Sequence, residues 1–202
     1  MGSWLFWGAP EAMDDHAVQA IEVELRATEW LSGVSADHPA ADFRTRFGIH
    51  TGPVLIGNIG GEERLNYTCI GESVNLASRI EGLNKVFGTR IMITGQTEAA
   101  LGDGYQTRQL DTIVVKGATE STVVYEVLGR TGQVSDEALR RARNYEEALN
   151  LYRTREFVAA ATRLETIVHD DPAATHLSER CRQFVSTPPD ESWDGAFRLV
   201  AK

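Results

Sequence analysis

A glycine-rich block from Phe47 to Lys85 constrains the fold of this 202-residue chain more than any other feature. It reads FGIHTGPVLIGNIGGEERLNYTCIGESVNLASRIEGLNK, and its glycines separate short apolar runs: Gly48, Gly52, Gly57, Gly60, Gly61 and Gly71. Such runs predict β-strands, while glycine allows tight turns and close approach of the backbone to a ligand. After Gly71 the apolar residues recur at helical spacing as far as Gly88. The block therefore predicts short, tightly turned strands that lead into a helix starting near residue 72.

The elements predicted around this block follow an α+β order. Within it, we expect Phe47–Ile49 and Val54–Ile59 to pair as a hairpin about a turn at residues 51–53, and Tyr67–Ile70 to form another strand. The other expected elements are the end of a buried strand at Trp4–Pro10, a helix at Asp14–Leu31, a loop at Ser32–Ala41, a strand at Arg90–Ile93, a helix at Thr94–Leu101, and strands at Tyr105–Val115 and Thr122–Leu128. Because strands and helices do not alternate strictly, the fold class is α+β rather than α/β.

The composition changes at Gly129–Ser135, which we take as a domain boundary. We expect a first domain at residues 1–130, a linker at 131–135 and a helical segment at 136–202. Helical spacing predicts two antiparallel helices joined near Arg155, and a third helix at Pro172–Phe184. The stretch Tyr145–Pro172 resembles one tetratricopeptide (TPR) unit. Since a single unit cannot stack, its apolar face is expected to dock on the first domain or on a partner.

Charge and cysteine content exclude several classes of protein. The formal net charge of -9 argues against a nucleic-acid partner, which needs a concentrated basic face. Cys69 and Cys181 lie far apart without zinc-site spacing, and this fits a reducing, cytoplasmic location. The apolar stretch Trp4–Pro10 is far too short to span a bilayer, so no membrane segment is expected in this chain.

Asn75 and Arg79 are the first candidate site residues. They lie four apart on the predicted helix, so both side chains occupy one face and can reach a common ligand. An amide can hold a ribose oxygen, and a guanidinium can place several donors on a phosphate whose charge grows during reaction. A solvated helix face is the alternative interpretation of the same pair.

The order and spacing of GIHTG, GNIG, NYTxIG and VNLASR resemble the second half of the class III nucleotidyl cyclase domain. WGAP followed by Asp15-His16-Ala17 resembles the segment before it, so the resemblance covers about residues 4 to 128. It implies a ferredoxin-like sandwich, here followed by a helical hairpin. It also implies a reaction in which the ribose 3′ hydroxyl attacks the α-phosphate of a nucleoside triphosphate and pyrophosphate leaves. Such enzymes build two active sites at a dimer interface, so we expect a homodimer that acts on ATP.

The resemblance assigns roles to individual residues. Asn75 would orient the ribose and Arg79 would stabilise the pentavalent phosphate. Thr68 stands where the family reads the base, and a threonine there resembles bacterial-type adenylate cyclases; the alternative is an ordinary strand threonine. Lys116, in VVKG, resembles the lysine that meets the terminal phosphates, although a solvated turn lysine gives the same pattern.

The metal ligands are where the chain departs from this resemblance. The family holds two Mg2+ or Mn2+ ions with two aspartates, which the count back from Trp7 places at about Met1 and further upstream. Asp14, Asp15 and the Glu62-Glu63 pair sit at an expected helix start and a solvated turn, so we assign no metal ligand. We therefore expect a cyclase domain that lacks its N-terminal portion, is inactive alone and exposes a sheet edge that favours oligomerisation.

The C-terminal segment resembles the tail of bacterial cyclases whose other end carries a membrane-anchored sensor. This resemblance implies that the parent protein is anchored in the membrane.

Two other functions remain open from the sequence. The alternative to an adenylate cyclase is a non-catalytic cyclase-like module that binds partners or regulates them. A nucleotide-binding domain of another fold is less favoured, because no GxxxxGKS or GxGxxG motif opens a helix.

Overall fold

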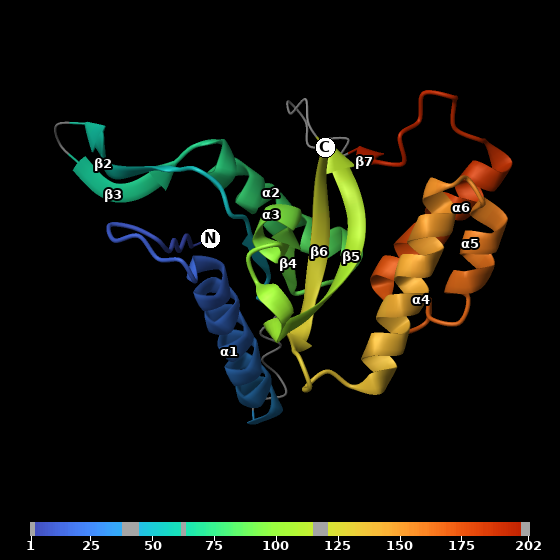
Figure 1. Cartoon of the computed structure of the whole chain (residues 1–202), viewed down its shortest axis with the longest axis horizontal. Helices are drawn as coiled ribbons and strands as arrows, with labels where there is room; N and C mark the ends of the chain where they lie inside the picture. Colours follow the sequence, from blue (N-terminus) through green and yellow to red (C-terminus); the bar gives the residue numbers. More distant parts are fainter. Residues whose placement is uncertain (1–2, 38–44, 62–63, 115–120, 199–202) are drawn as a thin grey trace.

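The computed structural model describes residues 3–37, 45–61, 64–114 and 121–198 (Figure 1). The helices are α1 (His16–Asp37), α2 (Glu72–Phe87), α3 (Gly95–Glu98), α4 (Asp136–Arg153), α5 (Phe157–Leu164) and α6 (Pro172–Ser186), with a 3-10 turn at Gly102–Gly104. The strands are β1 (Phe47–Ile49), β2 (Leu55–Gly61), β3 (Arg64–Ile70), β4 (Ile91–Thr94), β5 (Tyr105–Val114), β6 (Ser121–Arg130) and β7 (Phe197–Arg198). The predicted α+β class is confirmed by this order.

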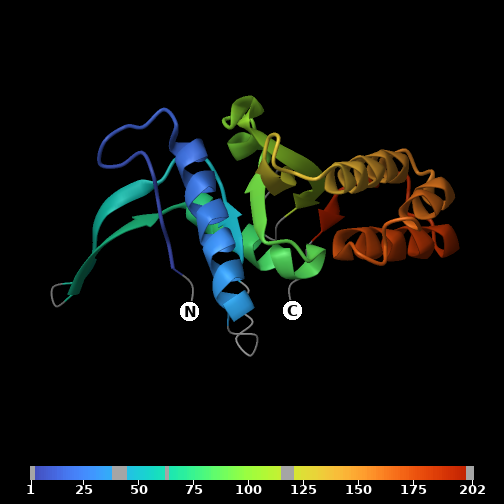
Figure 2. The same ribbon diagram turned by 90° about the horizontal axis from the view of Figure 1, so that it is seen from below.

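A mixed sheet in the order β1-β4-β6-β5-β7 forms the centre of the molecule. Strand β1 runs parallel to β4, β4 and β5 run antiparallel to β6, and β7 runs parallel to β5. Strands β2 and β3 form a separate antiparallel hairpin, which Figures 1 and 2 show on the opposite side of the sheet from α4–α6.

Helices cover both faces of the sheet, because side chains alternate between the two faces along each strand. In β4, Ile91 and Ile93 pack with α1, whereas Met92 packs with α2 and the C-terminal helices. The core beneath α1 also contains Ile21 and Leu25 of that helix. The other core joins the apolar faces of α2, α4, α5 and α6 to β5 and β6.

The predicted hairpin of Phe47–Ile49 with Val54–Ile59 is wrong. Strand β1 pairs with β4, residues 50–53 form a connection, and β2 pairs instead with β3. The pairing of β1 with the fully buried strand β4 outweighs the local turn signal of Thr51-Gly52-Pro53, because it joins β1 to the core sheet.

The N-terminal stretch Trp4–Pro10 is not a buried strand. It has no strand pairing with the described residues, and Trp4 and Leu5 are 49% and 62% exposed. Helix α1 begins at His16 and continues to Asp37, so it also includes the first part of the expected loop at Ser32–Ala41; residues 38–41 of that loop lie outside the described residues. The prediction of a buried strand rested on apolar content alone. The prediction that the loop begins at Ser32 rested on Gly33, which instead lies within the helix.

Several other elements match their predictions. Helix α2 spans Glu72–Phe87 and ends at Gly88, whose left-handed conformation (φ 69°) is the geometry that favours glycine after a helix. Helices α4 and α5 are joined through Arg155, and α6 begins at Pro172. Helix α4 is capped by Ser135, whose side chain accepts a hydrogen bond from the Ala138 backbone N–H.

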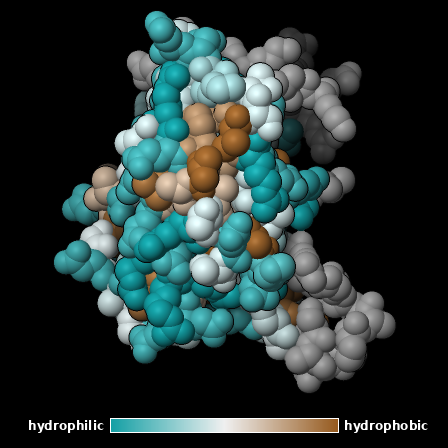
Figure 3. Space-filling view, turned by 90° about the vertical axis from the view of Figure 1, so that its right-hand side faces the viewer, coloured by the Kyte–Doolittle hydropathy of each residue, from teal (hydrophilic) through white to brown (hydrophobic). Residues whose placement is uncertain are grey.

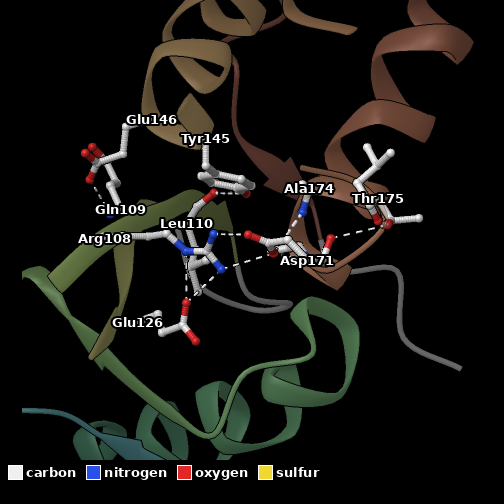
Figure 4. Close-up of polar contacts among 11 residues, drawn as sticks. Arg108, Gln109, Leu110, Glu126, Tyr145, Glu146, Asp171, Ala174 and Thr175 are labelled. Atoms are coloured by element: carbon white, nitrogen blue, oxygen red, sulfur yellow. Dashed lines mark hydrogen bonds and ion pairs between the residues drawn. The ribbon is translucent and has the colours of Figure 1, made fainter. Parts of the chain in front are cut away.

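The C-terminal helices are also tied to the sheet by buried charges (Figure 4). Arg108 of β5 donates from Nε to Glu126 of β6 at 2.9 Å and pairs with Asp171 at the start of α6. Its guanidinium lies 4.8 Å from the ring centroid of Tyr145, whose hydroxyl donates to the Leu110 carbonyl at 2.8 Å. The side chains that dock these helices are therefore buried and mutually hydrogen-bonded, as buried charges must be.

The contact between β1 and α2 predicts a strong effect of a methyl group at Gly48. A Cβ there would lie 2.3 Å from the Glu81 backbone nitrogen, whereas a Cβ at Gly57 would meet nothing within 4 Å. We expect Gly48→Ala to lower the free energy of unfolding by about 2 kcal/mol or more, and Gly57→Ala to change it far less. Urea denaturation measures both. Equal losses for the two variants would contradict this close approach.

The buried ion pair predicts a graded set of losses. Asp171→Ala removes the partner of Arg108 and the acceptor of the Ala173 and Ala174 N–H groups, so we expect a loss of about 3 kcal/mol or more. Asp171→Asn keeps the cap and should cost less. Glu147→Ala breaks an exposed pair with Arg163 and should cost below about 1 kcal/mol. Thermal or urea unfolding gives the order, and a neutral Asp171→Ala would contradict it.

Candidate nucleotide-binding site

The rotation of α2 about its axis is fixed by its contact with β1. Gly48 lets the helix backbone approach the strand, and the buried Asn84 side chain donates to the Phe47 carbonyl at 3.0 Å. Asn84 also accepts a hydrogen bond from the Thr89 hydroxyl at 2.7 Å, so both ends of its amide are satisfied. With Ile80 and Phe87 directed into the core, the orientation of every other α2 side chain is determined.

Asn75 and Arg79 lie on the exposed part of this helix. Both side chains are exposed, and their spacing of one turn places them on one edge of α2. Thr68 is half-buried on β3, opposite Gly57, and β3 continues through Gly71 into α2. Lys116 lies outside the described residues. A single chain thus presents Asn75 and Arg79 on an open surface, with the Thr68 strand leading into the same helix.

The connection at residues 50–53 anchors the start of α2. His50 Nδ1 lies 2.9 Å from the Thr94 hydroxyl, and Thr97 donates to Thr51 at 3.1 Å. At the other side, the Ser73 hydroxyl donates to the Pro53 carbonyl at 2.8 Å. These bonds join β4 and α3 to the first turn of α2.

Gly52 lies between the side chains of His50 and Ser73, where a larger residue has no room. A Cβ at Gly52 would lie 2.6 Å from both His50 Nε2 and Ser73 Oγ. The GIHTG motif therefore acts through packing and hydrogen bonds rather than as a hairpin turn. Sequence reasoning missed this role of His50 and Ser73, because their partners are distant in the chain; the glycines that flank His50 were the available signal.

The metal ligands that the family resemblance implies are not assigned to any of the described residues. Among residues 3–37, 45–61, 64–114 and 121–198, no three His, Cys, Asp or Glu side chains gather in a group that could hold a metal ion. Asp14 and Asp15 are exposed, Asp15 accepts a hydrogen bond from Gln19, and Glu62-Glu63 lies outside these residues. No catalytic step is therefore assigned to a metal through these side chains.

The fold and the position of α2 agree with a family match. Residues 4–129 match the adenylate and guanylate cyclase catalytic domain, which is more than half of the chain. The chain belongs to this family, as the resemblance of GIHTG, NYTxIG and VNLASR implied. None of the helices in the described residues is long and apolar enough to cross a membrane.

Two similar proteins are both named adenylate cyclases. Adenylate cyclase 1 of Rhizobium meliloti is 41% identical over 126 residues, which are 61% of this chain and 19% of that protein. A terminal-differentiation specific adenylate cyclase of Dictyostelium discoideum is 31% identical over 182 residues, which are 85% of this chain and 8% of that protein. The chain thus spans at most about a fifth of the length of these two relatives.

Two solved structures are similar to this one. The adenylyl cyclase CyaB from P. aeruginosa has a TM-score of 0.54 and 27% identity, covering 64% of this chain and 68% of that chain. The guanylyl cyclase Cya2 has a TM-score of 0.50 and 32% identity, covering 63% and 65%. The cyclase fold expected from the sequence is confirmed by these similarities.

The half-buried position of His50 predicts a pH dependence of stability. Burial lowers the pKa of His50 from its ordinary value of 6.5, so the unfolded chain binds a proton more readily than the native one. The free energy of unfolding therefore decreases as the pH falls below about 6.5, and His50→Gln removes this contribution. Urea denaturation between about pH 7 and pH 5 should show a smaller decrease for the variant. Parallel pH profiles would contradict a lowered pKa for the half-buried His50.

Proposed function

We propose that this chain is the nucleotide-binding part of an adenylate cyclase, which converts ATP into 3′,5′-cyclic AMP and pyrophosphate in cyclic-nucleotide signalling. The observation that supports this most is the geometry of α2. Gly48 and Asn84 fix the helix so that Asn75 and Arg79 share an exposed edge. An amide and a guanidinium presented together suit a ribose and the phosphate beside it.

The proposed reaction joins the ribose O3′ to the α-phosphorus and breaks the bond between that phosphorus and the pyrophosphate oxygen. Asn75 holds a ribose oxygen and so directs the 3′ hydroxyl toward the α-phosphate, while the hydroxyl proton passes to solvent water and pyrophosphate leaves with the electron pair of the broken bond. Arg79 places its donors on the phosphate oxygens, where negative charge grows in the transition state. This interaction strengthens along the reaction coordinate, so Arg79 acts chiefly on kcat.

We assign recognition of the adenine base to Thr68. Its hydroxyl can donate to and accept from the edge of an adenine, and its place on β3 is fixed by pairing with Gly57. Lys116, outside the described residues, is proposed to meet the terminal phosphates. We prefer an adenylate cyclase to a guanylate cyclase for two reasons: a threonine stands at position 68, and the two relatives described above are named adenylate cyclases.

The open position of Asn75 and Arg79 suits a site completed by another protein surface. We propose a homodimer in which a second copy closes over the exposed edge of α2. We also propose that the ligands of the Mg2+ or Mn2+ ions lie outside the described residues, and that the 202 residues alone do not turn over ATP. We propose that the reaction takes place in the cytoplasm, where ATP is available.

A non-catalytic interaction module is the second candidate. Figure 3 shows an apolar area on the side of the molecule formed by the C-terminal helices. Within that segment, Val158 of α5 and Val185 of α6 are 65% and 49% exposed. Exposed apolar area of this kind is suited to binding a protein partner.

A chimera separates the two candidates. The catalytic-domain residues that precede the matched region in Adenylate cyclase 1 of Rhizobium meliloti are fused before Trp4, and cyclic AMP is measured with ATP and Mn2+. We expect turnover by the chimera, and a fall in kcat of about 100-fold or more for Arg79→Ala. Asn75→Ala should also lower kcat, whereas Thr68→Ala should mainly raise KM for ATP.

Lys85→Ala is the matched control, because Lys85 is an exposed cation on the same helix with no assigned role. It should leave kcat within about twofold, since it makes no contact with the reacting groups in this proposal. A folded chimera that forms no cyclic AMP would sink the catalytic proposal and favour the interaction module.

A further inference from the structure

The C-terminal end of α2 contacts the C-terminal segment of the chain. The Phe87 ring meets His176 of α6 edge-to-face, with centroids 5.6 Å apart, and meets Phe197 of β7 at 6.2 Å. His176 and Phe197 also meet each other edge-to-face at 5.2 Å. The three rings form a cluster, and Phe87 is buried in it.

Gly88 makes a second contact at the same end of the helix. Its φ of 69° is rarely adopted by other residues, and a Cβ there would lie 2.4 Å from Cβ of Pro172, the first residue of α6. The backbone at the end of α2 thus rests on the start of α6. Only glycine meets both the conformational and the spatial demand.

Helix α6 and strand β7 are themselves fixed to the sheet. Asp171, just before α6, pairs with Arg108, and Arg180 within α6 pairs with the fully buried Asp111 of β5. The Arg180 guanidinium also lies 4.8 Å from the Phe197 ring centroid. Strand β7 pairs in parallel with the end of β5. The cluster at Phe87 is therefore attached to the central sheet through α6 and β7, so it can hold α2 in place.

We propose that α6 and β7 act as a positioning element for Asn75 and Arg79, so that the C-terminal segment is part of the catalytic unit. The inference rests on the proposed function. The first turn of α2 is held by the Ser73 hydrogen bond to the Pro53 carbonyl, and its last turn by the contacts of the Phe87 ring with His176 and Phe197. A helix this short moves as a rigid body. Loosening its C-terminal end therefore tilts the edge that carries the two side chains, and small displacements of such groups reduce turnover.

Hydrogen exchange on the 202-residue chain tests the mechanical part without any ligand. Phe197→Ala removes the β7 ring from α2, while Phe184→Ala removes a ring that contacts Tyr152, Phe157 and Trp193 instead. Both rings are half-buried at the edge of the same core, so they are matched in packing. We expect Phe197→Ala to speed amide exchange in Glu72–Phe87 by about tenfold, and Phe184→Ala to leave it within about twofold of wild type.

His176 provides a conservative rescue. His176→Ala should speed exchange in α2 as Phe197→Ala does, whereas His176→Phe keeps an aromatic ring against Phe87 and should restore wild-type exchange. If Phe184→Ala loosens α2 as much as Phe197→Ala, or if His176→Phe fails to restore exchange, the segment stabilises the fold in general and the positioning role is overturned.

The chimera described above tests the catalytic part. We expect Phe197→Ala to lower kcat about tenfold or more with KM for ATP within about twofold, because Thr68 lies on β3 and is not held by this cluster. Phe184→Ala should leave kcat within about twofold. Unchanged kcat in Phe197→Ala overturns the proposal. Failure of the parent chimera to make cyclic AMP refutes the proposed function instead, and the exchange experiment still decides whether α6 and β7 hold α2.

Discussion

The close approach of α2 to β1 at Gly48 is the constraint on which the rest of the structure depends. The Glu81 backbone nitrogen lies 2.3 Å from where a Cβ at position 48 would stand, and the Asn84 side-chain amide donates to the strand carbonyl. The backbone approach sets the distance of the helix from the strand, and the Asn84 hydrogen bond sets its rotation. The solvent-facing edge of α2, which carries Asn75 and Arg79, is a direct result of it.

Buried charge determines how the C-terminal helices sit on the sheet. An apolar face alone can slide, since hydrophobic contact has little direction, whereas Arg108 with Asp171 and Arg180 with Asp111 meet only in one register. Removing water from four charged groups costs free energy, and burying such pairs often adds no net stability over apolar residues. Their value here is in orientation: they fix where Phe197 and His176 meet α2.

The sequence predicted the elements whose signals are local. Helical spacing predicts α2 and the three C-terminal helices, Gly88 predicts the end of α2, and a spacing of four predicts that Asn75 and Arg79 share one edge of the helix. Pairings across long sequence distances were not accessible. The pairing of β1 with β4, the His50–Thr94 hydrogen bond and the Arg108–Asp171 ion pair each join residues that lie far apart in the chain. The Trp4–Pro10 prediction failed because apolar composition says nothing about which strand is available to pair.

The joint between Gly88 and Pro172 limits how this chain can change over evolutionary time. Any other residue at position 88 must adopt a strained backbone and also displace the proline ring, so a single substitution is penalised twice. In a chain with another residue at position 88, replacing Pro172 as well would relieve the crowding but would leave the backbone strain. Glycine is therefore expected at position 88 even where position 172 differs, and homologues that lack the C-terminal helices are free only of the spatial half of this restriction.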